Sequence, residues 1–304
     1  MAGTFDYLKL HFIVFLWGFT AILGMLISIP AVEMVFLRTL IATAGMGFVI
    51  YFTSGVFKLT GGDYIKIILT GFIVAAHWIA FFYSARIANV SVSLVGFATG
   101  SFWTAIIEPI SNRKKISFLE ISLGILVIAG LYIIFSFDFH YPLGLAFGIF
   151  SGLSGSIFSV INSKLVKRIP SLTITFYEMM GATLAIALYF PLYKTFVTSD
   201  GELHLNPTLP DWFYLCVLAL VCSVYAYTAV IELMKKLSTF FIQLTMTLEP
   251  IYGIVMAVII FGDREKMNTQ FYLGTAVIIS AVIFYPLLKR RQAANRTTYK
   301  SPDQ

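Results

Sequence analysis

Long apolar stretches recur along the whole chain and limit what it can fold into. A helix needs about 20 apolar residues to cross the hydrocarbon core of a bilayer. With 59% hydrophobic and only 12% charged residues, the chain is too apolar for an ordinary soluble domain. The stretches lack the period-two alternation of barrel strands, so we predict an all-α membrane protein with ten transmembrane helices. The ten stretches are residues 8–29, 31–53, 64–85, 88–110, 118–137, 142–164, 171–193, 212–233, 238–261 and 268–288.

The second half of the sequence repeats the first. Residues 123–128 (LGILVI) match residues 273–278 (LGTAVI) at an offset of 150, which applies from the third stretch onwards. The first two stretches match the sixth and seventh at an offset of 140, as in Pro30 with Pro170. Five helices is an odd number, so the second copy must lie upside down relative to the first. We predict two inverted five-helix repeats, residues 1–139 and 140–288, followed by a basic cytoplasmic tail at 289–304.

Basic residues are unevenly distributed over the segments between the stretches. If the amino terminus is cytoplasmic, sixteen Lys and Arg residues face the cytoplasm and four face the other side. Cytoplasmic loops of membrane proteins carry an excess of Lys and Arg, so this orientation is the expected one. We predict a multi-pass protein of the cell (inner) membrane with both termini in the cytoplasm. The net charge of +6 then reflects orientation, and we predict no nucleic-acid partner.

Motifs for catalysis or cofactor binding are missing from the sequence. Cys216 and Cys222 lie six residues apart on one predicted helix, about 9 Å along its axis, which is too far for a disulfide. No zinc-type spacing, phosphate-binding glycine loop or nucleophile elbow occurs. We therefore predict no enzyme activity, no cofactor and no metal site.

Several motifs resemble those of EamA-type members of the drug/metabolite transporter superfamily. In that family a mid-helix proline is followed thirteen residues later by an acidic residue and then by a glycine; Pro250, Asp263 and Gly274 fit, with Asp in place of the usual Glu. The resemblance covers about residues 8–288. It implies a ten-helix carrier whose central cavity is lined by helices one to four and six to nine, with helices five and ten at the periphery. The other motifs that carry it are Trp17-Gly18, Pro30 followed by Arg38, and the segment 247–253.

Two charged residues fall at matching depths inside predicted helices. Charge within a membrane is costly and usually faces a cavity or a partner. Arg38 and Glu178 each lie eight residues after a proline, about 12 Å into the membrane from opposite faces. Arg38 is a candidate for binding a substrate carboxylate, and Glu178 for binding an amine or a proton. The alternative for both is a structural pair with a neighbouring helix.

A third carboxyl group, that of Glu249, lies about ten residues into the ninth stretch. The next residue, Pro250, removes a backbone donor and kinks the helix, which leaves a carbonyl without its helical partner. A kink beside a carboxylate forms a polar niche of the kind in which transporters hold substrates and coupling ions. Glu249 is therefore a candidate for substrate binding or proton coupling, and a structural glutamate is the alternative.

Aromatic residues and one histidine complete the predicted site. His77 and Tyr227 match at the offset of 150 and fall in the middle of their stretches, and Phe102 and Tyr252 also match at this offset. For each residue, packing between helices is the alternative. We predict that the cavity is lined by His77, Trp78, Trp17, Phe102, Tyr227 and Tyr252 together with the charged residues.

These features predict a secondary active transporter that works by alternating access around a cavity at the membrane midplane. No ATP-binding motif occurs, so the energy would come from a proton or substrate gradient, with Glu249 or Glu178 as the proton carrier. The predicted substrates are small metabolites such as amino acids or related amphipathic compounds, and the resemblance favours export. The alternatives are a nucleotide-sugar or lipid-linked sugar translocator, a polytopic membrane enzyme and a non-transporting membrane scaffold. The predicted partners are a small molecule and the lipid bilayer, and the oligomeric state is left open.

Overall fold

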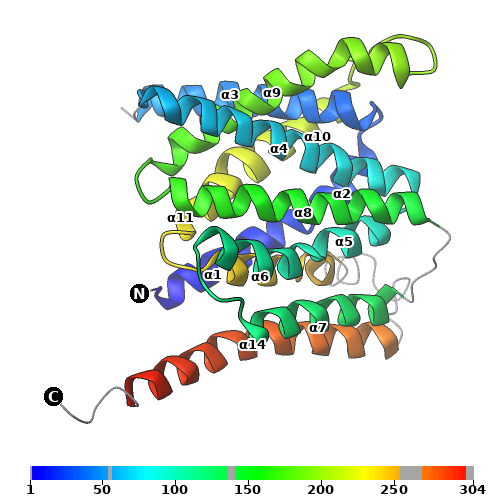
Figure 1. The fold of residues 1–304 in the computed structure, drawn as a ribbon. Helices are drawn as coiled ribbons and strands as arrows, with labels where there is room; N and C mark the ends of the chain where they lie inside the picture. Colours follow the sequence, from blue (N-terminus) through cyan, green and yellow to red (C-terminus); the bar gives the residue numbers. More distant parts are fainter. Residues whose placement is uncertain (1, 54–56, 136–140, 254–268, 299–304) are drawn as a thin grey trace.

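The computed structural model of the chain describes residues 2–53, 57–135, 141–253 and 269–298. All regular secondary structure in these ranges is helical (Figure 1). The helices are α1 (Thr4–Trp17), α2 (Thr20–Leu26), α3 (Ala31–Phe52), α4 (Gly61–Ile87), α5 (Val90–Ala98), α6 (Gly100–Ser111), α7 (Phe118–Phe135), α8 (Pro142–Leu165), α9 (Ser171–Phe196), α10 (Leu209–Cys216), the π-helix η1 (Val217–Tyr227), α11 (Thr228–Leu233), α12 (Thr239–Met246) and α14 (Thr269–Thr298).

The helices correspond to the predicted stretches, but several stretches are interrupted. The first is divided into α1 and α2 at Gly18, and the fourth into α5 and α6 at Thr99. Eight helical segments in the described ranges are long and apolar enough to cross a membrane. The fifth stretch forms the shorter helix α7, and the ninth is described only as far as Gly253. The all-helical class is confirmed over the described part of the chain, whereas the count of ten and the inverted repeat stay predictions.

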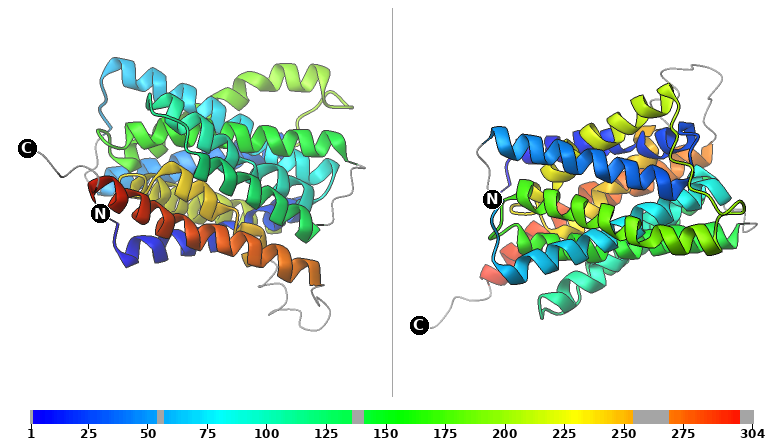
Figure 2. Two further views of the ribbon diagram at one scale, coloured as in Figure 1. Left: turned by 60° about the horizontal axis from the view of Figure 1, so that its bottom comes forward. Right: turned by 90° about the horizontal axis from the view of Figure 1, so that it is seen from above.

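The helices pack side by side in one bundle (Figures 1 and 2). α7 and α14 contact each other along one edge of it, in agreement with the peripheral position expected for helices five and ten. They approach closely at Gly130 and Gly274, where a Cβ on Gly130 would lie 3.2 Å from the Gly274 carbonyl. The beginning of α1 and the end of α14 lie at the same end of the bundle (Figure 1).

Basic side chains are paired with carboxylates at this same end of the bundle. It is the end that the distribution of Lys and Arg predicts to face the cytoplasm. Each pair joins segments far apart in the sequence, so the pairs connect the ends of different helices. They are Arg168 with Asp63 at 2.5 Å, Lys236 with Asp6 at 2.8 Å and Lys289 with Glu120 at 2.5 Å.

α4 and α9 cross at two glycines, Gly71 and Gly181. A Cβ on Gly71 would lie 2.8 Å from the backbone nitrogen of Ala182, and one on Gly181 would lie 2.9 Å from the Cα of Ile68. Both approaches are to backbone, which cannot move aside as a flexible side chain can. The crossing therefore depends on the absence of side chains, as is typical of helix contacts in membranes.

We expect Gly181→Val to lower the unfolding temperature in detergent by about 3 to 10 °C, because overpacking a helix contact costs about 1 to 3 kcal/mol. Gly62→Val is the matched control, since no atom lies within 4 Å of a Cβ at Gly62. A thermal unfolding scan of both variants measures the difference. Equal melting temperatures for the two variants would contradict the close crossing.

Candidate functional site

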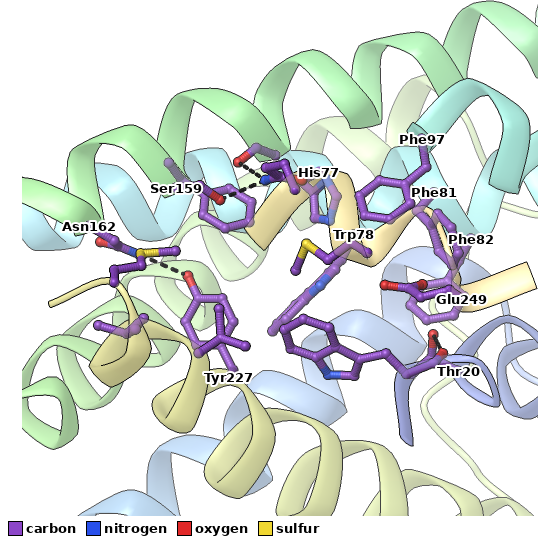
Figure 3. Close-up of a pocket in the computed structure, with 18 of the residues that line it drawn as sticks. Thr20, His77, Trp78, Phe81, Phe82, Phe97, Ser159, Asn162, Tyr227 and Glu249 are labelled. Carbon is purple, nitrogen blue, oxygen red and sulfur yellow. Dashed lines mark hydrogen bonds between the residues drawn. The ribbon is translucent and has the colours of Figure 1, made fainter. Parts of the chain in front are cut away.

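A cavity lies inside the bundle where helices from both halves of the chain meet (Figure 3). Its walls come from α1 to α5, α8, η1, α11, α12 and the short helical segment that begins at Glu249. α7, α9 and α14 contribute none of the described lining residues. The space open to water-sized molecules is about 60 Å³, so the cavity is narrow in this conformation.

Six of the predicted site residues line this cavity. Most of the remaining wall is aromatic or aliphatic, so the polar groups among the six stand out against an apolar background. They come from α1, α3, α4, η1 and the segment after α12, which are far apart in the sequence. The six are Trp17, Arg38, His77, Trp78, Tyr227 and Glu249.

Three predicted site residues lie elsewhere. Phe102 packs against α7, where a Cβ on Gly124 would lie 2.9 Å from its Cα. Tyr252 lines a separate groove near α14, and its hydroxyl lies 2.7 Å from Nδ1 of His11. Glu178 is fully buried behind the cavity wall. The matched pairs Phe102–Tyr252 and Arg38–Glu178 therefore do not face one common space, whereas the matched pair His77–Tyr227 does.

Arg38 provides the guanidinium of the cavity. Its side chain is buried, its Nε donates to Oγ of Ser223 at 2.9 Å, and its guanidinium carbon lies 3.9 Å from the ring centre of Trp78. A cation over an indole face is stabilised by the ring electrons, most strongly where water is excluded. Among the described residues no carboxylate lies within 4 Å of this guanidinium, and its two Nη groups have no protein partner. They are available to an anionic group of a ligand.

The π-helix η1 holds two of the cavity residues in place. It runs for 11 residues, and π-helical segments are rare and often found at functional sites. Its Ser223 hydroxyl donates to the carbonyl of Leu218 at 3.0 Å and so presents a lone pair to Arg38. Its Cys222 carbonyl accepts a hydrogen bond from Nε1 of Trp17 at 3.0 Å. Neither partner is predictable from the sequence, because nothing in the residue pattern indicates a π-helix.

Glu249 brings to the cavity a carboxylate that has no side-chain partner among the described residues. The side chain is 4% exposed, and its carboxylate points into the cavity near Trp78 and Phe82 (Figure 3). It makes no hydrogen bond or ion pair with another side chain in the described part of the chain. α12 ends at Met246 and the chain is helical again from Glu249, so the helix is interrupted just before Pro250, where the kink was predicted. A buried carboxylate without a cation is costly, which suits Glu249 to binding a proton or a cationic group.

Glu178 belongs to a hydrogen-bond network behind Tyr227. The Tyr227 hydroxyl donates to Oε2 of Glu178 at 2.9 Å, and Nδ2 of Asn162 donates to the same oxygen at 3.2 Å. Asn162 and Tyr227 both line the cavity (Figure 3), and through their bonds to Glu178 the network connects the cavity wall to that carboxylate. It also ties α8, α9 and η1 together. Glu178 thus lies behind Tyr227 and Asn162, whose side chains separate it from the cavity.

His77 faces the cavity in a fixed orientation. Its Nδ1 lies 2.7 Å from the carbonyl oxygen of Ser151, and its ring packs against Phe97 and Phe158. A carbonyl only accepts hydrogen bonds, so Nδ1 carries the proton of the neutral imidazole and Nε2 is left as an acceptor. His77 therefore offers a hydrogen-bond acceptor on an otherwise aromatic wall.

Two amide side chains in the wall were not among the predicted residues. Asn162 lies in the network described above, and Nε2 of Gln243 donates to Oγ of Ser159 at 2.9 Å. Each is the only amide residue in its apolar stretch, which is a signal that the sequence contains. Across the described ranges, no three His, Cys, Asp or Glu side chains group closely enough to hold a metal ion.

Known proteins share both sequence and fold with this chain. Residues 142–285 match the EamA-like transporter family. The uncharacterised transporter YxxF of Bacillus subtilis (strain 168) is 23% identical over 279 residues, which is 89% of this chain and 85% of that protein. A solved crystal structure superimposes with a TM-score of 0.74 over 96% of this chain and 99% of its own, and at 14% identity it shares the fold. Residues 142–285 of this multi-pass membrane protein are thus similar to the EamA-like transporter family, and the chain is similar over most of its length to a protein named as a transporter.

Proposed function

We propose that this transporter exports small amphipathic metabolites, with amino acids as the preferred class, by alternating access around the cavity. The observation that carries the proposal is a cation and a carboxylate in one aromatic cavity, neither of which forms an ion pair with any described residue. Arg38 and Glu249 both line it, and they do not form an ion pair with each other. Export is the direction that the family resemblance favours.

A zwitterion satisfies both charges at once. Its carboxylate can accept hydrogen bonds from the Nη groups of Arg38, and its ammonium can donate to Glu249. Leaving either charge buried and unpaired would cost several kcal/mol by general estimates. The rings of Trp78, Phe82 and Phe97 would contact the side chain of an amphipathic amino acid.

The cavity fits the alternative substrates less well. A nucleotide sugar carries two phosphates and needs several donors or cations to bind them, whereas Arg38 and His77 are the only basic side chains in the described lining. A solute with a single carboxylate is therefore favoured by the charges of the lining.

Proton coupling would follow from the same carboxylate. Such coupling needs a carboxylate that can exchange a proton for a substrate, and Glu249 forms no ion pair within the described structure. Glu249 cannot hold a proton and a substrate ammonium at the same time, so each would displace the other. That competition gives proton-for-substrate exchange, which is export when the proton gradient points inward. Glu178, reached through Tyr227, is the second candidate for the proton.

A thermal-shift screen of the purified protein tests the substrate class. We expect an amphipathic amino acid to raise the unfolding temperature, because a ligand at about 100 times its Kd adds about 2.7 kcal/mol to the folded state. The same molecule without its carboxylate, or without its amine, should stabilise much less. Stabilisation by nucleotide sugars but not by amino acids would overturn the proposal in favour of that alternative.

A flux assay tests direction and mechanism. We expect saturable counterflow of the stabilising amino acid in proteoliposomes, and proton-driven uptake into inside-out vesicles but not into right-side-out ones. Uptake into right-side-out vesicles would contradict export. Absence of any saturable flux for a compound that binds would support the non-transporting scaffold instead.

A further inference from the structure

Two helices of the bundle begin with the same pattern, a threonine followed three residues later by an aspartate. Thr60 precedes α4, and its Oγ1 donates to Oδ2 of Asp63 at 2.9 Å. Thr208 precedes α10, and its Oγ1 donates to Oδ2 of Asp211 at 2.8 Å. A threonine at the N-cap with an acidic residue three positions on is the pattern of a capping box, which stabilises the start of a helix. The full box forms at α10, whereas at α4 only the bond between the two side chains is made. Capping alone would explain these bonds.

Each aspartate also binds a short turn between two other helices. Nη1 and Nη2 of Arg168, in the turn between α8 and α9, donate to Oδ2 and Oδ1 of Asp63 at 2.5 and 2.6 Å. The backbone nitrogen and Oγ of Ser28, in the turn between α2 and α3, donate to Oδ1 and Oδ2 of Asp211 at 2.9 and 2.6 Å. A helix cap needs no such partner. The second set of bonds joins parts of the chain that are more than 100 residues apart.

The two contacts occupy equivalent positions in the sequence. Ser28 and Arg168 are 140 residues apart, the offset that aligns the first two helices with the sixth and seventh. Asp63 and Asp211 are 148 residues apart, close to the offset of 150 for the third and eighth helices. α4 and α10 begin at opposite ends of the bundle (Figure 1). A comparable contact, from an aspartate at a helix start to a turn between two other helices, is therefore made at each end.

Each contact connects the first half of the chain to the second. Asp63 belongs to the first half and Arg168 to the second, while Asp211 belongs to the second half and Ser28 to the first. If the cavity opens by movement of one group of helices against another, the contact at the opening end must break and the other can stay. Both contacts are formed in this structure, and the cavity between them is narrow.

We propose that these contacts are a matched pair of gates, in which Asp63–Arg168 closes the cavity at one end and Asp211–Ser28 closes it at the other. The proposal rests on the proposed alternating access and adds the bonds that restrain each end. The two gates differ in chemistry. Asp63–Arg168 is an ion pair whose Arg168 side chain is 51% exposed, whereas Asp211 is 2% exposed and is held by uncharged donors. Salt should therefore weaken the first gate more than the second.

Thiol labelling of a cavity cysteine from each side of the membrane tests the proposal. The background variant carries Val230→Cys, which places the thiol in the cavity wall, with Cys216→Ser and Cys222→Ala. A membrane-impermeant thiol reagent is added to right-side-out or inside-out vesicles. A separate Lys167→Cys variant, exposed next to Arg168, identifies the vesicle side on which that gate lies.

We expect Arg168→Gln to raise the labelling rate severalfold from the Arg168 side and to lower it from the other side. Asp211→Asn and Ser28→Ala should do the opposite, with the smaller effect for Ser28→Ala because its backbone donor remains. Thr60→Ala and Thr208→Ala are the matched controls, since they remove capping bonds but leave the bonds to the turns. Asp63→Asn replaces Arg168→Gln if the latter fails to fold.

The proposal is overturned if both gate variants raise labelling from the same side, or if the threonine controls shift it as strongly as the gate variants do. Unchanged labelling in folded gate variants overturns it as well. The assay uses no substrate, so its outcome is independent of the substrate class. A protein that transports something other than amino acids can still show the two opposite shifts.

Discussion

Glu249→Gln is expected to lower transport efficiency for an amino acid about 100-fold and to leave that of the corresponding acid without an amine almost unchanged. Glutamine keeps the size and one acceptor of the glutamate and removes its charge. Loss of a buried charge-assisted bond costs about 2 to 5 kcal/mol, and a factor of 100 corresponds to about 2.8 kcal/mol. Initial rates of counterflow in proteoliposomes with the two compounds measure the effect.

Glu232→Gln is the matched control for this variant. Glu232 pairs with Lys235 at 2.8 Å near the end of α11, and it does not line the cavity. We expect its transport to equal that of the unmodified protein. An equal loss for both test compounds in Glu249→Gln, with a normal unfolding temperature, would show that Glu249 does not bind the amine.

The same variant separates binding from coupling. If Glu249 also carries the proton, Glu249→Gln should lose accumulation driven by a pH gradient while it retains slow exchange of substrate for substrate. Undiminished proton-driven accumulation would exclude Glu249 as the proton carrier. Glu178→Gln then becomes the informative variant, because its carboxyl group is connected to the cavity through Tyr227.

Arg38→Gln is expected to give the complementary result. Transport of the amino acid should again fall about 100-fold, since a buried charge-assisted pair with a carboxylate contributes about 2 to 5 kcal/mol. The amine that lacks a carboxylate should be little affected. Arg38→Lys should recover only part of the loss, because lysine lacks the planar, forked donor group that stacks on Trp78.

The effects of Arg38 substitutions are measured by counterflow and thermal shift. Both use the amino acid, the corresponding acid without an amine and the corresponding amine without a carboxylate. Arg291→Gln, at an exposed position near the end of α14, is the control and should behave as the unmodified protein. If Arg38→Gln lowers the unfolding temperature and weakens the binding of every compound equally, Arg38 holds the helices together and does not bind substrate.

Depth in the membrane is predictable from this sequence, because it depends on the distance along a helix from its polar end. Arg38 and Glu249 were found in this way, since charge in an apolar stretch needs a functional or structural reason. Both line the cavity, as do His77 and Trp78 on α4. The helical class follows from the same physics, because a backbone in lipid must satisfy its own hydrogen bonds.

Which side chains of a helix point towards the cavity is harder to predict from the sequence than how deep a residue lies in the membrane. Phe102 matches Tyr252 in the repeat, yet α6 begins after a break at Thr99 and turns Phe102 towards α7. Tyr252 follows the interruption after Met246 and faces His11. A break of one or two residues rotates everything that follows by 100° or more, since helical residues are spaced about 100° apart. Pro250 indicates the second break, but the break at Thr99 and the π-helix η1 leave no such signal in the sequence.

The narrowness of the cavity also bears on the electrical insulation of the membrane. A space of about 60 Å³ has room for only a few water molecules. No continuous column of water of the kind that conducts protons fits within it. A carrier that uses an ion gradient must not let the ions cross the membrane uncoupled between transport cycles. In this conformation, the aromatic rings of Trp78, Phe82 and Phe158 line the narrow space, and within the described residues they leave no room there for such a column.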